Sequence, residues 1–582
     1  MKRLLSIVIV TLLGFSIFAQ DNSNTYKDTT IIKDIEIVKE YNPVIKDAGK
    51  ISTMPELKDI KSEKKNSNYS VWTSPITLEP SQIQVLDYAL PSNEIINTYN
   101  KRIIRLGGGN YASALGEVYT PIFQNKRNDL NLILLHKSSF GYIDLTPKSY
   151  PNLSKSLESK ATTNRNKAKL SYTRNIKNKE LISYVKGDYN FFKYYGYDSK
   201  MDELVNKGIY KTDNDSNNQS SLKLAANIRF RSKDYISKWK YDLQTNYRLF
   251  SNKNKLKEHT IFTDLNGEYR LESSSFGLNM NMHNIIMDRP ESDELYNYSK
   301  ERNLHSYTML KLTPHYTYTN EMAKIIIGIR GSFSIGQGKK GAITPDIYAD
   351  VRIAKEKIYL YAGVTGDYVV NSYYNIIEQN QYIASDTRLE DTYIPIDVYA
   401  GFRFKFFNQL DFNLRAGYKI INNAYFFVNK LSPDSLVLNQ FDAVYEENAG
   451  VFEAAAKLSY DWKERLNIRL GAKFNKWSLS KYEYAWHRPN WVLDFHSTYM
   501  INKYLRVNLC YEFEAGRYAQ INNKAIKLNN THNLSLGADW NILNWLNVFV
   551  NLDNITNTEY QDWYGYTKQG FNILGGVTFW LK

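Results

Sequence analysis

Two stretches near the C-terminus decide the fold of this chain: Leu546-Asn-Val-Phe-Val-Asn-Leu-Asp553 and Phe571-Asn-Ile-Leu-Gly-Gly-Val-Thr-Phe-Trp-Leu-Lys582. In the first, every second residue is apolar and most of the others are polar, so a strand here has one apolar face and one largely polar face. The second is an apolar, aromatic strand that reaches the last residue. Because such a strand would be an aggregation-prone edge, we expect its edge to pair with the first strand of the sheet. The two stretches predict a closed β-barrel in an outer membrane.

The same alternation runs through the chain from about Asn97. In Leu466–Phe474, for example, Leu466, Ile468 and Leu470 alternate with Asn467, Arg469 and Gly471. Several of these runs are about ten residues long, which is enough for a tilted strand to cross a bilayer. Alternation alone also fits a soluble secreted β-protein, which ranks third, after the two membrane-barrel functions given below.

The connections between the runs favour the barrel. Short connections near Asn178, Asn320 and Asn502 alternate along the chain with long ones such as Gly141–Thr162 and Asn422–Glu447. Short turns at one end and long loops at the other are typical of outer-membrane barrels. An even strand number then predicts about 22 antiparallel strands, in a range of 20–22. The count requires a first strand at Asn97–Leu106, turned by Gly107-Gly-Gly109.

Composition agrees with a barrel. Hydrophobic residues make up 43% of the 582 residues and aromatic residues 14%, with 47 Tyr, which suit a membrane–water boundary. The net charge of +14 is spread over loops and strand faces, so we expect no nucleic-acid partner. Cys510 is the single cysteine, which excludes an intramolecular disulfide.

The N-terminal part has a different character. Residues 1–20 read as a signal peptide, with Lys2 and Arg3 before an apolar run and Ala19 for cleavage. Residues 21–96 are too polar and broken to form a core, and we expect a short periplasmic arm or reduced plug. The barrel domain is residues 97–582. The predicted location is the outer membrane, in contact with its lipid and lipopolysaccharide, with the arm in the periplasm and the long loops extracellular.

The closing segment resembles the C-terminus of TonB-dependent outer-membrane receptors. It reads Asn551-Leu-Asp-Asn-Ile-Thr-Asn-Thr-Glu-Tyr-Gln-Asp-Trp-Tyr-Gly-Tyr566, followed by Gln569-Gly570 and the last strand. Together with Leu106-Gly-Gly-Gly-Asn-Tyr111 and the short arm, it is similar to a plug-reduced, receptor-like branch found in Bacteroidota. The resemblance implies a receptor or transporter with a 22-stranded barrel. It does not identify the ligand.

The resemblance also gives the arm a role. Ile35-Glu36-Ile37-Val38, followed by Lys46-Asp-Ala48, looks like the family's energy-coupling segment. It implies a TonB-type energy transducer as partner, bound by strand addition. A short strand in the arm that binds other envelope proteins, or nothing, is the competing interpretation.

Six arginines are candidates for lining the lumen, because they fall on the polar face of their strands: Arg229, Arg231, Arg248, Arg403, Arg469 and Arg506. They would attract an anionic solute. Acidic residues such as Asp242 and Glu512 share that face, so a mutually compensating, hydrated wall is the competing interpretation.

No catalytic, metal-binding or cofactor-binding motif stands out, and we expect neither an enzyme nor a cofactor. Two functions remain. The first is a receptor/transporter-like barrel that binds its ligand through the outer loops. The second is a structural or accessory barrel subunit of an envelope assembly or secretion machine, with no transport of its own.

Overall fold

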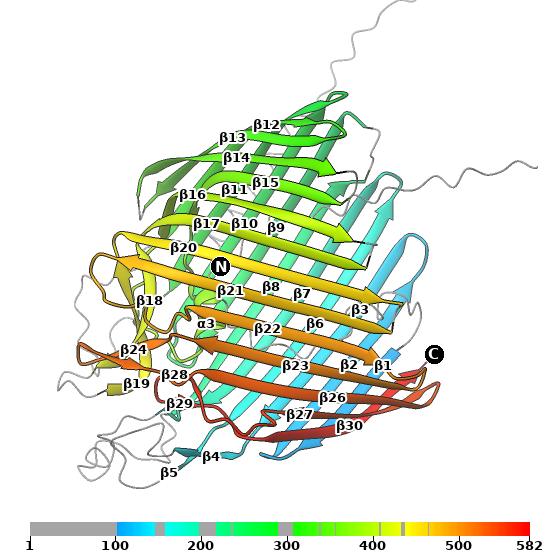
Figure 1. Ribbon diagram of the computed structural model, residues 1–582, viewed down its shortest axis with the longest axis vertical. Coiled ribbons are helices and arrows are strands. Elements are labelled where there is room, and N and C mark those ends of the chain that lie inside the picture. Colours follow the sequence, from blue (N-terminus) through cyan, green and yellow to red (C-terminus); the bar gives the residue numbers. More distant parts are fainter. Residues whose placement is uncertain are drawn as a thin grey trace, which may run out of the picture. The chain divides into compact units, whose positions relative to one another are not determined.

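The computed structural model describes residues 102–145, 157–196, 217–233, 237–288, 306–336, 339–354, 357–406, 409–431, 437–463 and 465–581. These residues form one 22-stranded antiparallel sheet in which each strand pairs with the next along the chain. The last strand pairs with the first, which closes the sheet into a barrel (Figure 1). Both the fold class and the predicted strand number are therefore confirmed.

The bounds of the barrel strands follow, in chain order: β1 (Arg102–Gly109), β2 (Ser113–Gln124), β3 (Asn128–Ser139), β6 (Thr163–Ile176), β7 (Lys179–Lys193), β8 (Asn218–Ser232), β9 (Trp239–Asn252), β10 (Lys257–Arg270), β11 (Ser274–Asp288), β12 (Tyr307–Thr319), β13 (Ala323–Ile335), β14 (Gly341–Ala354), β15 (Ile358–Val369), β16 (Thr392–Phe406), β17 (Leu410–Asn422), β20 (Ala449–Trp462), β21 (Leu466–Leu479), β22 (Trp491–Met500), β23 (Leu505–Ala515), β26 (Thr531–Leu543), β27 (Leu546–Asp553) and β30 (Asn572–Leu581).

The alternation of side chains decides which face of each strand is outside. Val185 and Ile228 lie on the outer face and are 60% and 62% exposed. Asn227, the residue before Ile228, lies on the inner face and is 3% exposed. Exposed apolar side chains around a closed barrel are what a bilayer requires, because the acyl chains bury them. Within the described ranges, no helix has the length and apolar character to cross a membrane.

The two ends of the barrel differ as predicted. At one end the strands are joined by short turns, several of which an asparagine stabilises. In the turn at 320–323, the side-chain oxygen of Asn320 accepts hydrogen bonds from the backbone N–H groups of Met322 and Ala323, at 2.9 and 2.6 Å. Because this bond pattern tightens a turn locally, short asparagine-bearing links join neighbouring strands.

At the other end the longer segments form structure of their own. Four carry two-stranded hairpins: β4–β5 (Tyr142–Leu145 and Leu157–Lys160), β18–β19 (Ala424–Leu431 and Val437–Glu446), β24–β25 (Tyr518–Ile521 and Lys524–Lys527) and β28–β29 (Gln561–Trp563 and Tyr566–Thr567). The segment between β15 and β16 carries the helix α3 (Tyr373–Gln379).

The prediction for the first strand is wrong at its C-terminal boundary, and its predicted start lies outside the described residues. The strand placed at Asn97–Leu106 begins at Arg102 within the described residues, and Gly107–Gly109 belong to it instead of forming the turn. The turn lies at 110–112, where Tyr111 and Ala112 have φ angles of 54° and 47°.

The glycines are needed in β1 because neighbouring atoms come very close. The ring of Phe549 from β27 lies against Gly107, and a Cβ there would be 3.0 Å from that ring. At Gly109 a Cβ would collide with the backbone carbonyl of Ile573. Close packing at the junction of the first and last strands, and not chain reversal, therefore accounts for Gly107 and Gly109.

Candidate functional site

The segments at the long-loop end fold toward one another and form a buried aromatic layer. Its members share low exposure and come from six different connections and from the strand ends beside them: Ile143, Ala161, Phe192, Tyr194, Tyr195, Phe250, Leu256, Tyr373, Tyr374, Ile376, Tyr382, Ile383, Leu389, Tyr425, Phe427, Phe441, Trp563 and Tyr566. We call this set the loop layer. No single loop could bury this much aromatic surface, so the loops stabilise one another.

Phe441 of β19 lies in the middle of the loop layer and is completely buried. Its ring contacts Trp563 and Tyr566, with centroids 5.5 and 6.0 Å apart. Its backbone pairs with the segment after α3: the N–H of Phe441 donates to Tyr382 at 3.0 Å, and its carbonyl accepts from Ala384 at 2.8 Å. One residue therefore joins three connections.

Stacking between distant loops adds to this joint. The rings of Tyr382 and Tyr566 are nearly parallel, with centroids 3.6 Å apart. The Tyr195 ring meets Tyr566 edge-on at 4.9 Å, and its hydroxyl donates to the carbonyl of Thr567 at 3.1 Å. Aromatic pairs of this geometry contribute about 0.5–1.5 kcal/mol each beyond their burial.

His487, in the connection between β21 and β22, packs against the loop layer, with its ring centroid 5.5 Å from that of Phe441 and 5.2 Å from that of Trp563. The ring is 2% exposed. Its Nδ1 lies 2.8 Å from the carbonyl of Phe427, and its Nε2 accepts the N–H of Tyr564 at 3.2 Å. Only the neutral ring with its proton on Nδ1 satisfies both bonds. Burial, helped by the nearby cations Arg517 and Arg488, lowers the pKa of His487 to about 3.

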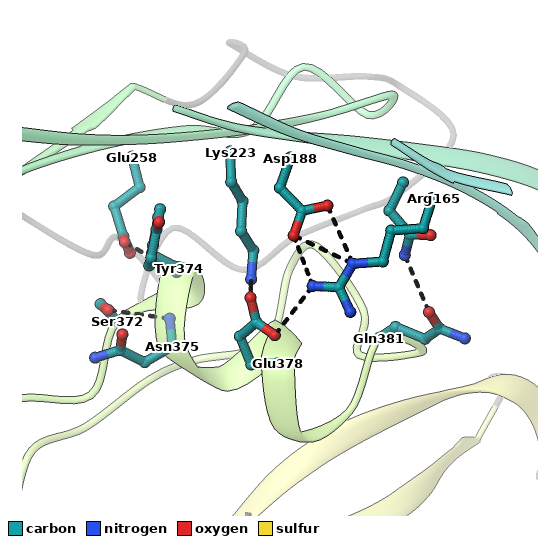
Figure 2. A network of polar contacts seen from close by, with 10 residues as sticks. Arg165, Asp188, Lys223, Glu258, Ser372, Tyr374, Asn375, Glu378 and Gln381 are labelled. Atoms are coloured by element: carbon teal, nitrogen blue, oxygen red, sulfur yellow. Dashed lines mark hydrogen bonds and ion pairs between the residues drawn. The ribbon is translucent and has the colours of Figure 1, made fainter. Parts of the chain in front are cut away.

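The connection 370–391 reaches from β15 and β16 to the inner face of β6 to β10 (Figure 2). Ser372 caps α3 by accepting from the N–H of Asn375 at 3.3 Å. The carboxylate of Glu258 on β10 accepts the N–H groups of Tyr373 and Tyr374, at 2.7 and 3.1 Å. These bonds fix the N-terminal turn of the helix to the wall, because they satisfy donors that a helix start leaves open.

The other end of α3 makes an ion-pair network with the wall (Figure 2). The Glu378 carboxylate lies 2.6 Å from Nζ of Lys223 on β8 and 3.5 Å from the guanidinium of Arg165 on β6. Arg165 also pairs with Asp188 of β7 at 2.6 Å. Burial raises the pKa of Glu378, but the charges of Lys223 and Arg165 outweigh it and hold this pKa below its usual value.

The strand register places all six predicted arginines on the face that carries Lys223 and Asp188. Three lie beside acids: Arg229 pairs with Asp242, Arg231 with Glu180, and Arg403 with Asp350. Arg248 lies over the ring of Tyr374 at 5.3 Å. Arg469 stands opposite Ser459 and His496, and Arg506 stands opposite Asp539. Whether this face conducts an anionic solute stays a prediction.

Several functional candidates were missed by sequence reasoning, above all α3 with Glu378 and its anchor Glu258. The available signal was the pair of tyrosine doublets, Tyr194-Tyr195 and Tyr373-Tyr374, inside otherwise polar connections. Paired aromatics in a loop indicate that the loop is packed. The predicted energy-coupling segment Ile35–Val38 and residues 1–96 lie outside the described residues.

No protein-family model matches the sequence, and no curated protein is similar to it. Solved structures do match. The FrpB iron transporter from Neisseria meningitidis has a TM-score of 0.61 at 11% identity, over 83% of this chain and 82% of that one. The siderophore receptor PirA from Acinetobacter baumannii has a TM-score of 0.59 at 8% identity, over 83% and 80%. The copper transporter OprC has a TM-score of 0.58 at 11% identity, over 83% and 81%.

These similarities concern the fold, since the identities are low. They cover most of both chains, and the matched structures are TonB-dependent outer-membrane receptors. Nothing in them distinguishes the predicted Bacteroidota branch, which stays a prediction. The described part of this chain therefore has the 22-stranded barrel fold of TonB-dependent outer-membrane receptors.

Proposed function

We propose that this protein is a receptor/transporter-like barrel of the outer membrane that binds a solute through its outer loops and admits it to a charged lumen. One observation carries the proposal: the connection 370–391 belongs to the loop layer and also makes ion pairs with the inner wall. A ligand that acts on the loops therefore acts on the wall as well. The long loops are extracellular in this proposal, and residues 21–96 form the periplasmic arm.

The names of the matched structures support uptake as the role. They are an iron transporter, a siderophore receptor and a copper transporter. A shared barrel at such low identity says nothing about which solute this chain takes, since binding residues differ freely on one fold. The proposal therefore includes no ligand name, no catalytic residue and no resident cofactor.

The test is purification of the tagged, full-length protein from its native outer membrane, followed by mass spectrometry of co-purifying small molecules and proteins. A single barrel that carries a defined solute supports the receptor. A solute-free barrel in constant ratio with other envelope proteins contradicts it.

That second result would favour a structural or accessory subunit of an envelope machine. One observation supports this alternative: the loops already bury one another, with Phe427 and Phe441 at most 1% exposed. A barrel whose own loops close its mouth needs no ligand to be stable. The two functions also predict different results when the loop layer is loosened. In a receptor the solute should then reach the lumen more easily, whereas an accessory subunit has no solute to admit.

Energy coupling through Ile35–Val38 is a separate part of the proposal. Strand addition by a TonB-type transducer requires a segment rich in apolar, β-branched residues, and three of the four residues of Ile35-Glu-Ile-Val38 are of this type. Deletion of Thr30–Val38 should abolish pull-down of the transducer while leaving the barrel folded. Unchanged pull-down and unchanged growth would remove the coupling and leave the barrel itself in place. Lipid and lipopolysaccharide around the barrel are the remaining proposed partners.

A further inference from the structure

The inner wall beneath α3 carries an unbalanced group of positive charges. The register aligns Lys169 of β6 directly with Lys186 of β7, and Lys186, through Ala225, with Arg248 of β9. As the strands pair, this cross-strand row continues into Ile133 and Thr260 and holds three cations and no acid. Like charges directly opposite each other destabilise a sheet, so the arrangement calls for a reason.

Elsewhere on the same face, cations lie beside acids. Lys473 pairs with Glu453 at 3.0 Å, and Lys419 lies 3.5 Å from Asp397. The row of Lys169, Lys186 and Arg248 is instead flanked by aromatic rings: Lys169 lies over Tyr184 at 5.0 Å, and Arg248 over Tyr374. A ring face attracts a cation but does not cancel its charge. The row therefore keeps a positive field.

The acids that act on Lys186 belong to the next row and to α3, and Asp264 of β10 acts on Arg248. The row above pairs Lys167, Asp188 and Lys223, and Asp188 is already shared with Arg165. The other acid is Glu378, whose carboxylate contacts Lys223 and Arg165 (Figure 2). The Glu378 side chain is 41% exposed whereas that of Lys223 is 7% exposed. An acid on a loop, open to water, thus covers a buried cation of the wall.

We propose that this part of the wall is a binding site for a solute with two anionic groups, carboxylate or phosphate, and that Glu378 occupies the place of one of them. This rests on the proposed function and adds the chemical class of the solute. One anionic group replaces the Glu378 carboxylate at Lys223 and Arg165, and the other meets Lys186, Lys169 and Arg248. The two rows are two residues apart, about 7 Å along a strand, which two linked anionic groups can span.

Displacement of Glu378 has a consequence for the loop. Its carboxylate is the ion-pairing contact between α3 and β8, while Glu258 holds the other end of the helix. A solute that takes over Lys223 therefore releases the C-terminal end of α3 from β8, while other contacts of the connection, such as the hydrogen bond between Gln381 and Asn190 of β7, remain. Binding at the wall and loosening of the loop layer are coupled by competition for the same cation.

The test uses the full-length protein in detergent, with pyrophosphate and the dicarboxylate succinate as probes and glycerol as a neutral control. Calorimetry measures binding, and hydrogen exchange follows the peptide that contains α3. We expect one of the two anions to bind and to speed exchange in α3. Glu378→Gln should bind that anion at least tenfold more tightly, because the internal competitor is gone. The pair Lys169→Gln and Lys186→Gln should weaken binding at least tenfold without touching Lys223.

Lys473→Gln is the matched control, since it removes an inner-wall lysine that already has an acid partner. The inference is overturned if Glu378→Gln binds no more tightly than the natural chain, if Lys473→Gln weakens binding as much as the double variant, or if neither anion binds. Failure of the proposed function looks different. If a solute co-purifies and stays bound to the Lys169→Gln, Lys186→Gln variant, the proposed receptor function holds but the proposed binding site is rejected.

Discussion

Acidification should open the loop layer through His487. The buried ring is neutral, because Nδ1 donates to Phe427 and Nε2 accepts from Tyr564. Once the layer opens, the ring titrates with the ordinary pKa of 6.5, against about 3 in the closed layer. The open state therefore binds a proton that the closed state refuses, so the closed layer is fully favoured above pH 6.5 and loses stability as the pH falls toward 3.

The magnitude follows from this difference. At pH 5 the open form has gained about 2 kcal/mol relative to neutral pH, since each pH unit below the open-state pKa of 6.5 is worth about 1.4 kcal/mol. That corresponds to a roughly 30-fold larger open population. Local opening of this kind is measured by amide exchange, because it exposes hydrogen-bonded N–H groups without unfolding the barrel.

The assay is hydrogen exchange at pH 7 and pH 5, corrected for the intrinsic pH dependence, on peptides covering 424–446 and 554–571. His487→Asn is the control: its amide can still donate to Phe427 but does not titrate. We expect protection in these peptides to fall about 30-fold in the natural chain and to change little in the variant. Equal losses in both proteins would refute the reasoning, because the proton would then be taken up elsewhere.

Three further predictions concern packing, charge and closure. Phe441→Ala removes a completely buried ring and should destabilise the loop layer by about 3–5 kcal/mol, seen as faster exchange in 373–389; Phe571→Ala, whose side chain is 39% exposed, should leave that exchange unchanged. Arg229→Glu with Arg231→Glu turns two ion pairs into four acids, so bilayer recordings should show a shift toward cations, and an unchanged reversal potential would exclude these residues from the conducting path. Gly576→Ala should prevent barrel assembly, because a Cβ would collide with the backbone of Leu106 and Gly107; Gly575→Ala, where the nearest atoms are 3.7 Å away, should assemble normally by gel mobility of unheated samples.

The barrel could be predicted from the sequence because its signal is local. Alternation in Leu466–Phe474 records which side chains meet lipid, whatever the neighbouring strand is. The strand number came from the order of short and long connections, which also needs no tertiary contact. The closing of the barrel at Phe571–Lys582 followed from the cost of a free edge.

The loop layer could not be predicted in this way. Tyr382 and Tyr566 stack although they are far apart in the sequence, and no periodicity relates them. In the sequence, nothing distinguishes Glu258 from other polar residues at the start of a strand. Its role appears only in the structure, where it accepts a hydrogen bond from the first turn of α3. The prediction of a turn at 107–109 was wrong because Phe549 and Ile573, which require glycine at 107 and 109, lie in other strands.

The pairing of β1 with β30 has a mechanical consequence. Over its last three positions Gly107, Gly108 and Gly109 face Gly576, Gly575 and Leu574, so almost no side chains meet across this end of the junction. Elsewhere in a sheet such facing pairs contribute about 0.2–1 kcal/mol each. Here the two strands are joined mainly by backbone hydrogen bonds. The ring of Phe549 packs against Gly107 and Gly576, and the guanidinium of Arg105 lies 3.8 Å from the centre of that ring. The junction of β1 and β30 is therefore weakest at its glycine end, and a lateral opening of the barrel between these two strands would start there.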